Sequence, residues 1–140
     1  MKLAAIDIGS NAVRLLISEV VEQAEGTPDF IKTVLVRVPL RLGFDVFERG
    51  SISGKKVEQL VKTMQAYKLL LDVYGVRHLK ACATSAMRDA ANTQEVLQRI
   101  KTESGITVRV ISGEEEATLI YENHIADYMD PAESYLYIDV

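Results

Sequence analysis

Three short polar segments contain residues that are suited, by type and by spacing, to bind an anion or to promote its reaction. The first, Asp7-Ile8-Gly9-Ser10-Asn11, places a carboxylate at the end of an apolar run, followed by glycine and two small polar residues. Such a turn directs backbone N–H groups toward phosphate oxygens, and Gly9 lets an anion approach the main chain. Asp7 could hold Mg²⁺ beside those phosphates. A hairpin turn explains Gly-Ser-Asn equally well, although an unpaired carboxylate in an apolar strand is costly.

The second segment covers residues 83–90 and reads Ala-Thr-Ser-Ala-Met-Arg-Asp-Ala. It follows a predicted buried strand, and the ligands of α/β sheets usually lie beyond the carboxyl ends of such strands. Arg88 would offer a planar fork of donors to a phosphate there. Alternatively, Thr84 and Ser85 cap a helical turn and Arg88 pairs with a surface carboxylate, which the segment read alone slightly favours.

The third segment, Ser112-Gly113-Glu114-Glu115-Glu116-Ala117, opens a predicted helix. Acidic residues in a first helical turn are stabilised by the helix dipole by about 0.3–1 kcal/mol each, and Glu115 completes a capping box with Ser112. Capping therefore explains Glu114 and Glu115. It does not explain Glu116, which neighbours apolar residues and could turn inward to accept a proton from an attacking water.

The composition excludes several other classes of protein. A formal net charge of −4 argues against a general nucleic-acid binder, and no run of about twenty apolar residues predicts a membrane span. The single cysteine, Cys82, cannot form an internal disulfide, which fits a reducing compartment. We therefore expect the protein to be located in the cytoplasm. His78 and His124 have no metal-ligand partners nearby in the sequence, and zinc binding is not predicted.

These segments must be positioned by a series of strands and helices, which the hydrophobic pattern predicts. Residues 39–53, with Gly43 and Gly50, are predicted to be a loop. The capping pattern Asn92-Thr93-Gln94-Glu95 opens the second of three predicted helices. The predicted strands cover residues 3–8, 13–21, 30–38, 76–83, 107–111 and 135–140, and the helices begin near Ser53, Asn92 and Ser112.

The predicted order is three strands followed by alternating helices and strands, βββαβαβα. A meander followed by helix-linked strands implies an α/β fold with a mixed sheet and helices packed on it. This is the pattern of a ribonuclease H-like half-domain. We expect such a domain over residues 1–132 and read residues 133–140 as the opening strand of a second, truncated domain.

Taken together, the segments resemble the exopolyphosphatase and guanosine pentaphosphate phosphohydrolase family of the actin-like ATPase superfamily. Five collinear motifs carry the resemblance, at residues 4–11, 41–53, 83–92, 111–117 and 137–140. The chain departs from the family's pattern in three places. Ala12 replaces a frequent serine, Lys55 and Lys56 replace acidic residues, and residues 44–47 are bulkier than the usual glycine-rich loop.

The resemblance also implies a role for each site residue. Glu116 would be the catalytic base that activates water. The phosphate-binding residues would be Gly9, Ser10, Asn11 and Arg88, and the residues beside a Mg²⁺ cofactor would be Asp7 and Asp139. Independently of the resemblance, the positions of Arg37 and Arg41 on either side of Pro39 suggest that they could border a path for a polyanion.

We therefore expect a hydrolase that releases the terminal phosphate of inorganic polyphosphate, with this chain alone inactive. Guanosine pentaphosphate is an alternative substrate that these residues do not distinguish from polyphosphate. A phosphate- or nucleotide-binding module without catalysis, and a sugar kinase, are further alternatives. We expect no nucleic-acid or membrane partner, and a homodimer when the protein is complete.

Overall fold

The computed structural model describes residues 1–23 and 28–124 of the 140-residue chain. Its centre is a five-stranded sheet in the order β3-β2-β1-β4-β5. The first three strands pair antiparallel, and β4 and β5 continue the sheet parallel to β1. The strands are β1 (Lys2–Ile8), β2 (Val13–Val21), β3 (Asp29–Val38), β4 (His78–Ala83) and β5 (Arg109–Val110). The predicted mixed sheet is confirmed.

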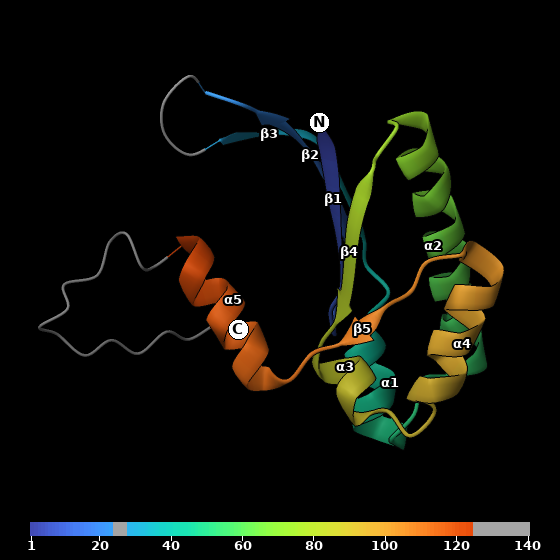
Figure 1. Cartoon of the computed structure of the whole chain (residues 1–140). Helices are drawn as coiled ribbons and strands as arrows, with labels where there is room; N and C mark the ends of the chain where they lie inside the picture. The colour runs from blue at the N-terminus through green and yellow to red at the C-terminus, as the bar shows by residue number, and fades with distance from the viewer. Residues whose placement is uncertain (24–27, 125–140) are drawn as a thin grey trace, which may run out of the picture.

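Within residues 1–23 and 28–124, five helices lie around this sheet (Figure 1). In the view of Figure 1, α2 and α4 pack on one face, α5 lies on the other side, and α1 and α3 lie below the ends of β1 and β4. The helices are α1 (Leu42–Arg49), α2 (Gly54–Val73), α3 (Ser85–Asp89), α4 (Thr93–Ser104) and α5 (Gly113–His124). No described helix is long and apolar enough to cross a membrane.

The hydrophobic core lies between the sheet and α2. Alternate residues of β1 and β2, such as Ile6 and Leu15, point toward this helix and are buried, as the two-residue period of a strand requires. Leu60 and Met64 of α2 meet them at helical spacing. Buried Tyr67 donates its hydroxyl to main-chain carbonyls of β2 and β3, at 2.9 and 3.3 Å. The core therefore fixes the strands that end at the polar turn.

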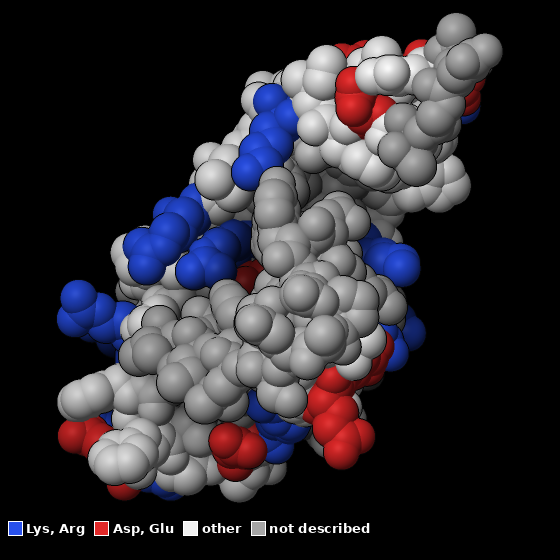
Figure 2. Space-filling model, turned by 90° about the vertical axis from the view of Figure 1, so that its left-hand side faces the viewer, with Lys and Arg blue, Asp and Glu red and all other residues white. Residues whose placement is uncertain are grey.

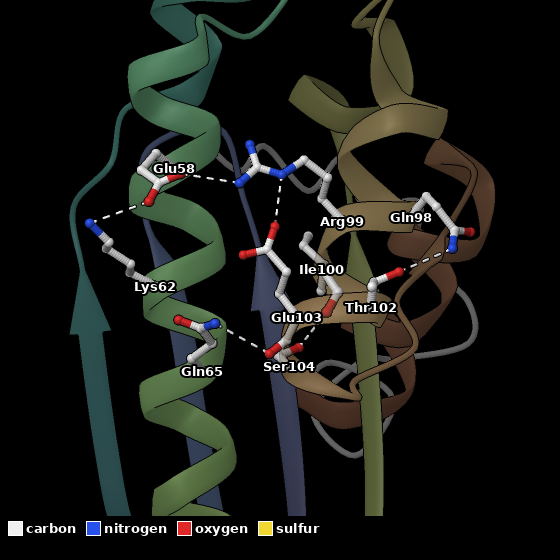
Figure 3. Close-up of polar contacts among 9 residues, drawn as sticks. All are labelled: Glu58, Lys62, Gln65, Gln98, Arg99, Ile100, Thr102, Glu103 and Ser104. Carbon is white, nitrogen blue, oxygen red and sulfur yellow. Dashed lines mark hydrogen bonds and ion pairs between the residues drawn. The ribbon is translucent and has the colours of Figure 1, made fainter.

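The outer surfaces of α2 and α4 are joined by polar contacts (Figure 3). Arg99 of α4 reaches Glu103 on its own helix at 2.9 Å and Glu58 on α2 at 3.1 Å. Gln65 donates to the main-chain oxygen of Glu103. Exposed ion pairs of this kind contribute about 0–1 kcal/mol, so buried apolar residues such as Val96 and Ile100 provide most of this packing.

Two sequence predictions about local structure are wrong. Residues 42–49 form helix α1 where a loop was predicted. The prediction failed because the apolar Phe44 and Phe47 are exposed in this helix and the charged Asp45 is buried. That arrangement inverts the pattern by which an amphipathic helix is recognised. The side chain of Asn92 does not cap α4. It pairs instead with the main-chain N–H and C=O of Ile52, at 3.0 and 2.8 Å.

The remaining elements differ from prediction mainly at their ends. The strand predicted at residues 76–83 begins at His78, and the strand predicted at 107–111 is reduced to Arg109–Val110. Residues 85–89 form the short α3, so the helical turn of the alternative interpretation is present, but the Thr84 side chain makes no capping hydrogen bond. The final strand predicted at residues 135–140, and with it the proposed domain boundary, lies outside the described residues.

Candidate active site

The three polar segments meet at the carboxyl-terminal ends of the parallel strands of the sheet. β1, β4 and β5 are parallel neighbours, so their carboxyl ends lie side by side. The turn after β1, the segment after β4 and the start of α5 after β5 follow these ends directly. This is the edge at which α/β sheets usually bind ligands. The parallel topology therefore explains how residues far apart in the sequence form one site.

The turn between β1 and β2 is tight. The N–H of Gly9 donates to the carbonyl of Ala12 at 3.0 Å, and a Cβ at Gly9 would lie 3.3 Å from that oxygen. A side chain at this position would press against the Ala12 carbonyl, which favours glycine, and the N–H of Gly9 is already hydrogen-bonded. The N–H groups of Ser10 and Asn11 have no protein acceptor within the described ranges, which leaves them available to an anion.

Neighbouring segments hold this turn from two sides. The hydroxyls of Ser10 and Ser85 lie 2.6 Å apart, which joins the turn to the segment after β4. On the other side, the N–H groups of Arg41 and Gly43 donate to the carbonyls of Asn11 and Ser10, at 2.8 and 2.9 Å. Sequence reasoning missed these supporting roles. The Arg-Leu-Gly motif at residues 41–43 was the signal that could have indicated them.

Arg88 and Glu116 are brought together as an ion pair. One guanidinium nitrogen of Arg88 lies 3.3 Å from a Glu116 carboxylate oxygen and donates to the carbonyl of Ile111 at 2.8 Å. The two side chains are 31% and 35% exposed, so both are partly accessible to a ligand. The start of α5 is capped only in part as predicted. The Ser112 hydroxyl accepts a hydrogen bond from the N–H of Glu115, but the Glu115 carboxylate pairs with Arg109 and does not complete the capping box. Glu116 takes no part in the cap and pairs with Arg88.

Asp7 lies within electrostatic range of Glu116. Burial raises the pKa of Asp7 above its usual value, the Arg14 guanidinium at 3.4 Å opposes this shift, and the negative charge of Glu116 adds to it. A carboxylate whose ionised form is disfavoured by burial and by a neighbouring negative charge is a suitable ligand for a divalent cation. Within residues 1–23 and 28–124, no group of three His, Cys, Asp or Glu side chains gathers. Asp139, the second predicted metal-binding residue, lies outside the described residues.

Arg14 and Arg37 stand in the same row of the sheet as Asp7. The strand register pairs Asp7 with Arg14 and Arg14 with Arg37, so the three side chains project from one face. Figure 2 shows the side of the molecule on which α5 lies, and Lys and Arg side chains gather along its left part. Cations on this side suit a negatively charged ligand.

An Asp7→Asn substitution is expected to preserve or raise the stability of the chain. Since the pKa of Asp7 is raised in the folded state, ionisation of Asp7 costs more there than in the unfolded chain. Folding stability should therefore fall as the pH rises through this pKa, and asparagine removes that loss. Urea unfolding at acidic and neutral pH measures the effect. A less stable variant at neutral pH would mean that pairing with Arg14 outweighs burial.

Comparison with known proteins agrees with this geometry. The Ppx/GppA phosphatase family matches residues 17–140. Exopolyphosphatase 1 of Mycobacterium tuberculosis is 31% identical over 121 residues, which cover 86% of this chain and 34% of that protein. The chain thus spans about a third of the length of the curated relatives it matches.

Solved structures show the same fold. A Ppx/GppA family member from Aquifex aeolicus superposes with a TM-score of 0.78 at 35% identity, covering 86% of this chain and 38% of that one. An exopolyphosphatase from Cytophaga hutchinsonii superposes with a TM-score of 0.75 at 31% identity, and the match covers 85% of this chain and 36% of that one. These likenesses confirm the predicted fold class, the amino-terminal α/β half-domain of the actin-like ATPase type. With the family match over most of its length, the chain belongs to the Ppx/GppA phosphatase family.

Proposed function

We propose that this chain forms one wall of a phosphohydrolase active site that releases terminal phosphate from inorganic polyphosphate. The observation that supports this proposal most directly is the placement of Glu116. Its carboxylate pairs with Arg88 and lies close enough to Asp7 to affect the pKa of that residue, beside a turn with free N–H groups. A base, a cation and an anion-binding turn thus share one sheet edge. The relatives named exopolyphosphatase agree with this substrate.

In this proposal each residue has a defined task. The N–H groups of Ser10 and Asn11 bind oxygens of the terminal phosphate, and Arg88 stabilises charge on the phosphoryl group. Glu116 orients a water molecule and accepts its proton as the water oxygen attacks phosphorus. The bond to the bridging oxygen breaks, and the shortened chain leaves as an oxyanion.

We propose that a magnesium ion binds beside Asp7, a described residue at the end of β1. Asp7 would hold it, with Asp139 as the predicted second ligand, and the ion would neutralise charge on the phosphate oxygens. The mutual repulsion of Asp7 and Glu116 would decrease when such a cation lies near both. The cytoplasmic location and the homodimer inferred from sequence remain predictions.

The test is phosphate release by a protein of the relatives' full length that carries these residues. We expect Mg²⁺-dependent release of inorganic phosphate from polyphosphate, and no phosphate transfer to a sugar hydroxyl. A parallel assay with guanosine pentaphosphate decides between the two substrates. Binding of polyphosphate without release from either substrate would instead support a binding module. The chain of residues 1–140 alone should release little phosphate, because it spans only about a third of the length of the relatives named exopolyphosphatase.

A further inference from the structure

Arg41 adopts a backbone conformation that a residue with a side chain rarely takes. Its φ of 53° and ψ of 49° lie in the left-handed region, and it is the only non-glycine residue of the described chain at positive φ. Such conformations are unfavourable and persist only where the surrounding structure enforces them. Arg41 immediately precedes α1, so this conformation sets where that helix begins.

The contacts that enforce it connect Arg41 to the polar turn. The N–H of Arg41 donates to Asn11, as described above, and its carbonyl accepts a hydrogen bond from the Lys56 ammonium at 2.5 Å. Gly43, two residues later, bonds to Ser10, and its Cα lies so close that an added Cβ would be 2.8 Å from the Ser10 Cβ. The start of α1 is thus pressed against the turn.

Lys56 is itself held in place by three groups. Its ammonium lies 2.9 Å from an Asp45 carboxylate oxygen, 5.7 Å from the centre of the Phe44 ring, and against the Arg41 carbonyl. Its side chain is only 19% exposed. Asp45 is fixed in turn by the N–H of Ser53 at 2.9 Å. A lysine that is partly buried and bound on several sides has a defined position, unlike a typical surface lysine.

From these contacts we propose that Lys56 is a positioning residue for the phosphate-binding turn, acting through the backbone of Arg41. Its ammonium bonds to the Arg41 carbonyl and holds the left-handed conformation that places Arg41 and Gly43 against Asn11 and Ser10. Without it, the start of α1 relaxes and the turn loses one of its two supports. This inference rests on the proposed phosphate-binding role of the turn.

The test compares Lys56→Met with Lys55→Met in the present chain. Both substitutions remove one positive charge and keep an unbranched side chain, but within the described residues Lys55 makes no ion pair or side-chain hydrogen bond. The first measurement is amide hydrogen exchange at Arg41 and Gly43, with the amide of Ile100 on α4 as an internal reference. The second is the affinity for inorganic tripolyphosphate, from titration by NMR.

We expect Lys56→Met to speed exchange at Arg41 and Gly43 by about tenfold or more, with Ile100 unchanged. Affinity for tripolyphosphate should fall by about tenfold. Lys55→Met should change neither quantity beyond a small charge effect, and Lys56→Arg should restore much of both. If Lys56→Met does not fold, Asp45→Asn serves as the second variant. It removes the charge that holds Lys56 while keeping an acceptor for Ser53, and should give the same local pattern more weakly.

Unchanged exchange at Arg41 and Gly43 in Lys56→Met would overturn the inference, as would equal loss of affinity in the two lysine variants. Faster exchange at all three amides would also overturn it, because it would indicate a general loss of stability. If the unmodified chain does not bind tripolyphosphate, the proposed function loses support. The exchange measurement would still decide the role of Lys56.

Discussion

A Glu116→Gln substitution in a protein of the relatives' full length is expected to reduce phosphate release by about 10²- to 10⁴-fold. Glutamine keeps the shape of the side chain and can still accept a hydrogen bond from Arg88, which lies 3.3 Å from the carboxylate. It cannot take a proton from the attacking water. Affinity for polyphosphate should stay within a few-fold, because Arg88 and the turn at Ser10 and Asn11 remain intact. Steady-state release of phosphate and equilibrium binding measure the two effects separately.

Glu114→Gln is the matched control for this experiment. Glu114 lies in the same first turn of α5 and is exposed, and among the described residues its carboxylate makes no ion pair. Both variants lose the same favourable interaction with the helix dipole, about 0.3–1 kcal/mol. If Glu114→Gln impairs release as much as Glu116→Gln, the effect is one of charge or helix stability. Full activity of Glu116→Gln would remove Glu116 from the catalytic role.

Gly43→Ala is expected to have the second-largest effect, a loss of phosphate affinity, although Gly43 has no side chain that could contact a phosphate. The added methyl carbon would lie 2.8 Å from the Cβ of Ser10 and 3.4 Å from its carbonyl oxygen. The Ser10 Cβ is attached directly to the backbone, so relief requires the turn itself to move. Overpacking of this kind typically costs about 1–3 kcal/mol. Affinity of the chain for tripolyphosphate should fall by about tenfold or more, together with the midpoint of thermal unfolding.

Gly54→Ala provides a control at the start of α2. A Cβ there would meet no atom within 4 Å, and Gly54 is not at positive φ. Alanine forms helices better than glycine by about 0.5–1 kcal/mol, so this variant should be as stable as the original chain or more so. Its affinity for tripolyphosphate should not change. Normal binding by Gly43→Ala would show that the turn tolerates displacement and that its contact with α1 does not matter for phosphate.

The sheet and the long helices were predictable from sequence because burial decides them. The alternation of Ile6, Ile8, Leu15 and Ile17 and the helical spacing along α2 report directly which face meets the core. Helix α1 was not predictable in this way. It is placed by the partly buried ion pair of Asp45 with Lys56 and by the left-handed Arg41, while its two phenylalanines are exposed to solvent. Neither feature produces a periodic hydrophobic signal.

The sequence indicated most residues of the candidate site, but it did not indicate the contacts that hold these residues in place. Turn chemistry indicated Gly9, Ser10 and Asn11, and the unexplained third glutamate of α5 indicated Glu116. The contact of Ser10 with Ser85 depends on the parallel pairing of β1 with β4, which short-range sequence patterns do not report. The role of Asn92 was mistaken for the same reason, since its amide bonds to Ile52, forty residues earlier in the sequence.

Strand β5 pairs with β4 over only two residues, and this affects how the candidate site would respond to substitutions elsewhere in the chain. β4 and β5 share only the pairs Cys82–Arg109 and Ala83–Val110, followed by one bond from Ile111 to Ala83. The turn that we propose binds the anion follows β1, the central strand of the sheet, whereas Glu116 lies in the helix that follows β5, its shortest strand. Under the proposed function, substitutions in the core are therefore expected to change anion affinity through the turn. The position of Glu116 depends instead mainly on the contacts of Arg88 with Glu116 and with the Ile111 carbonyl.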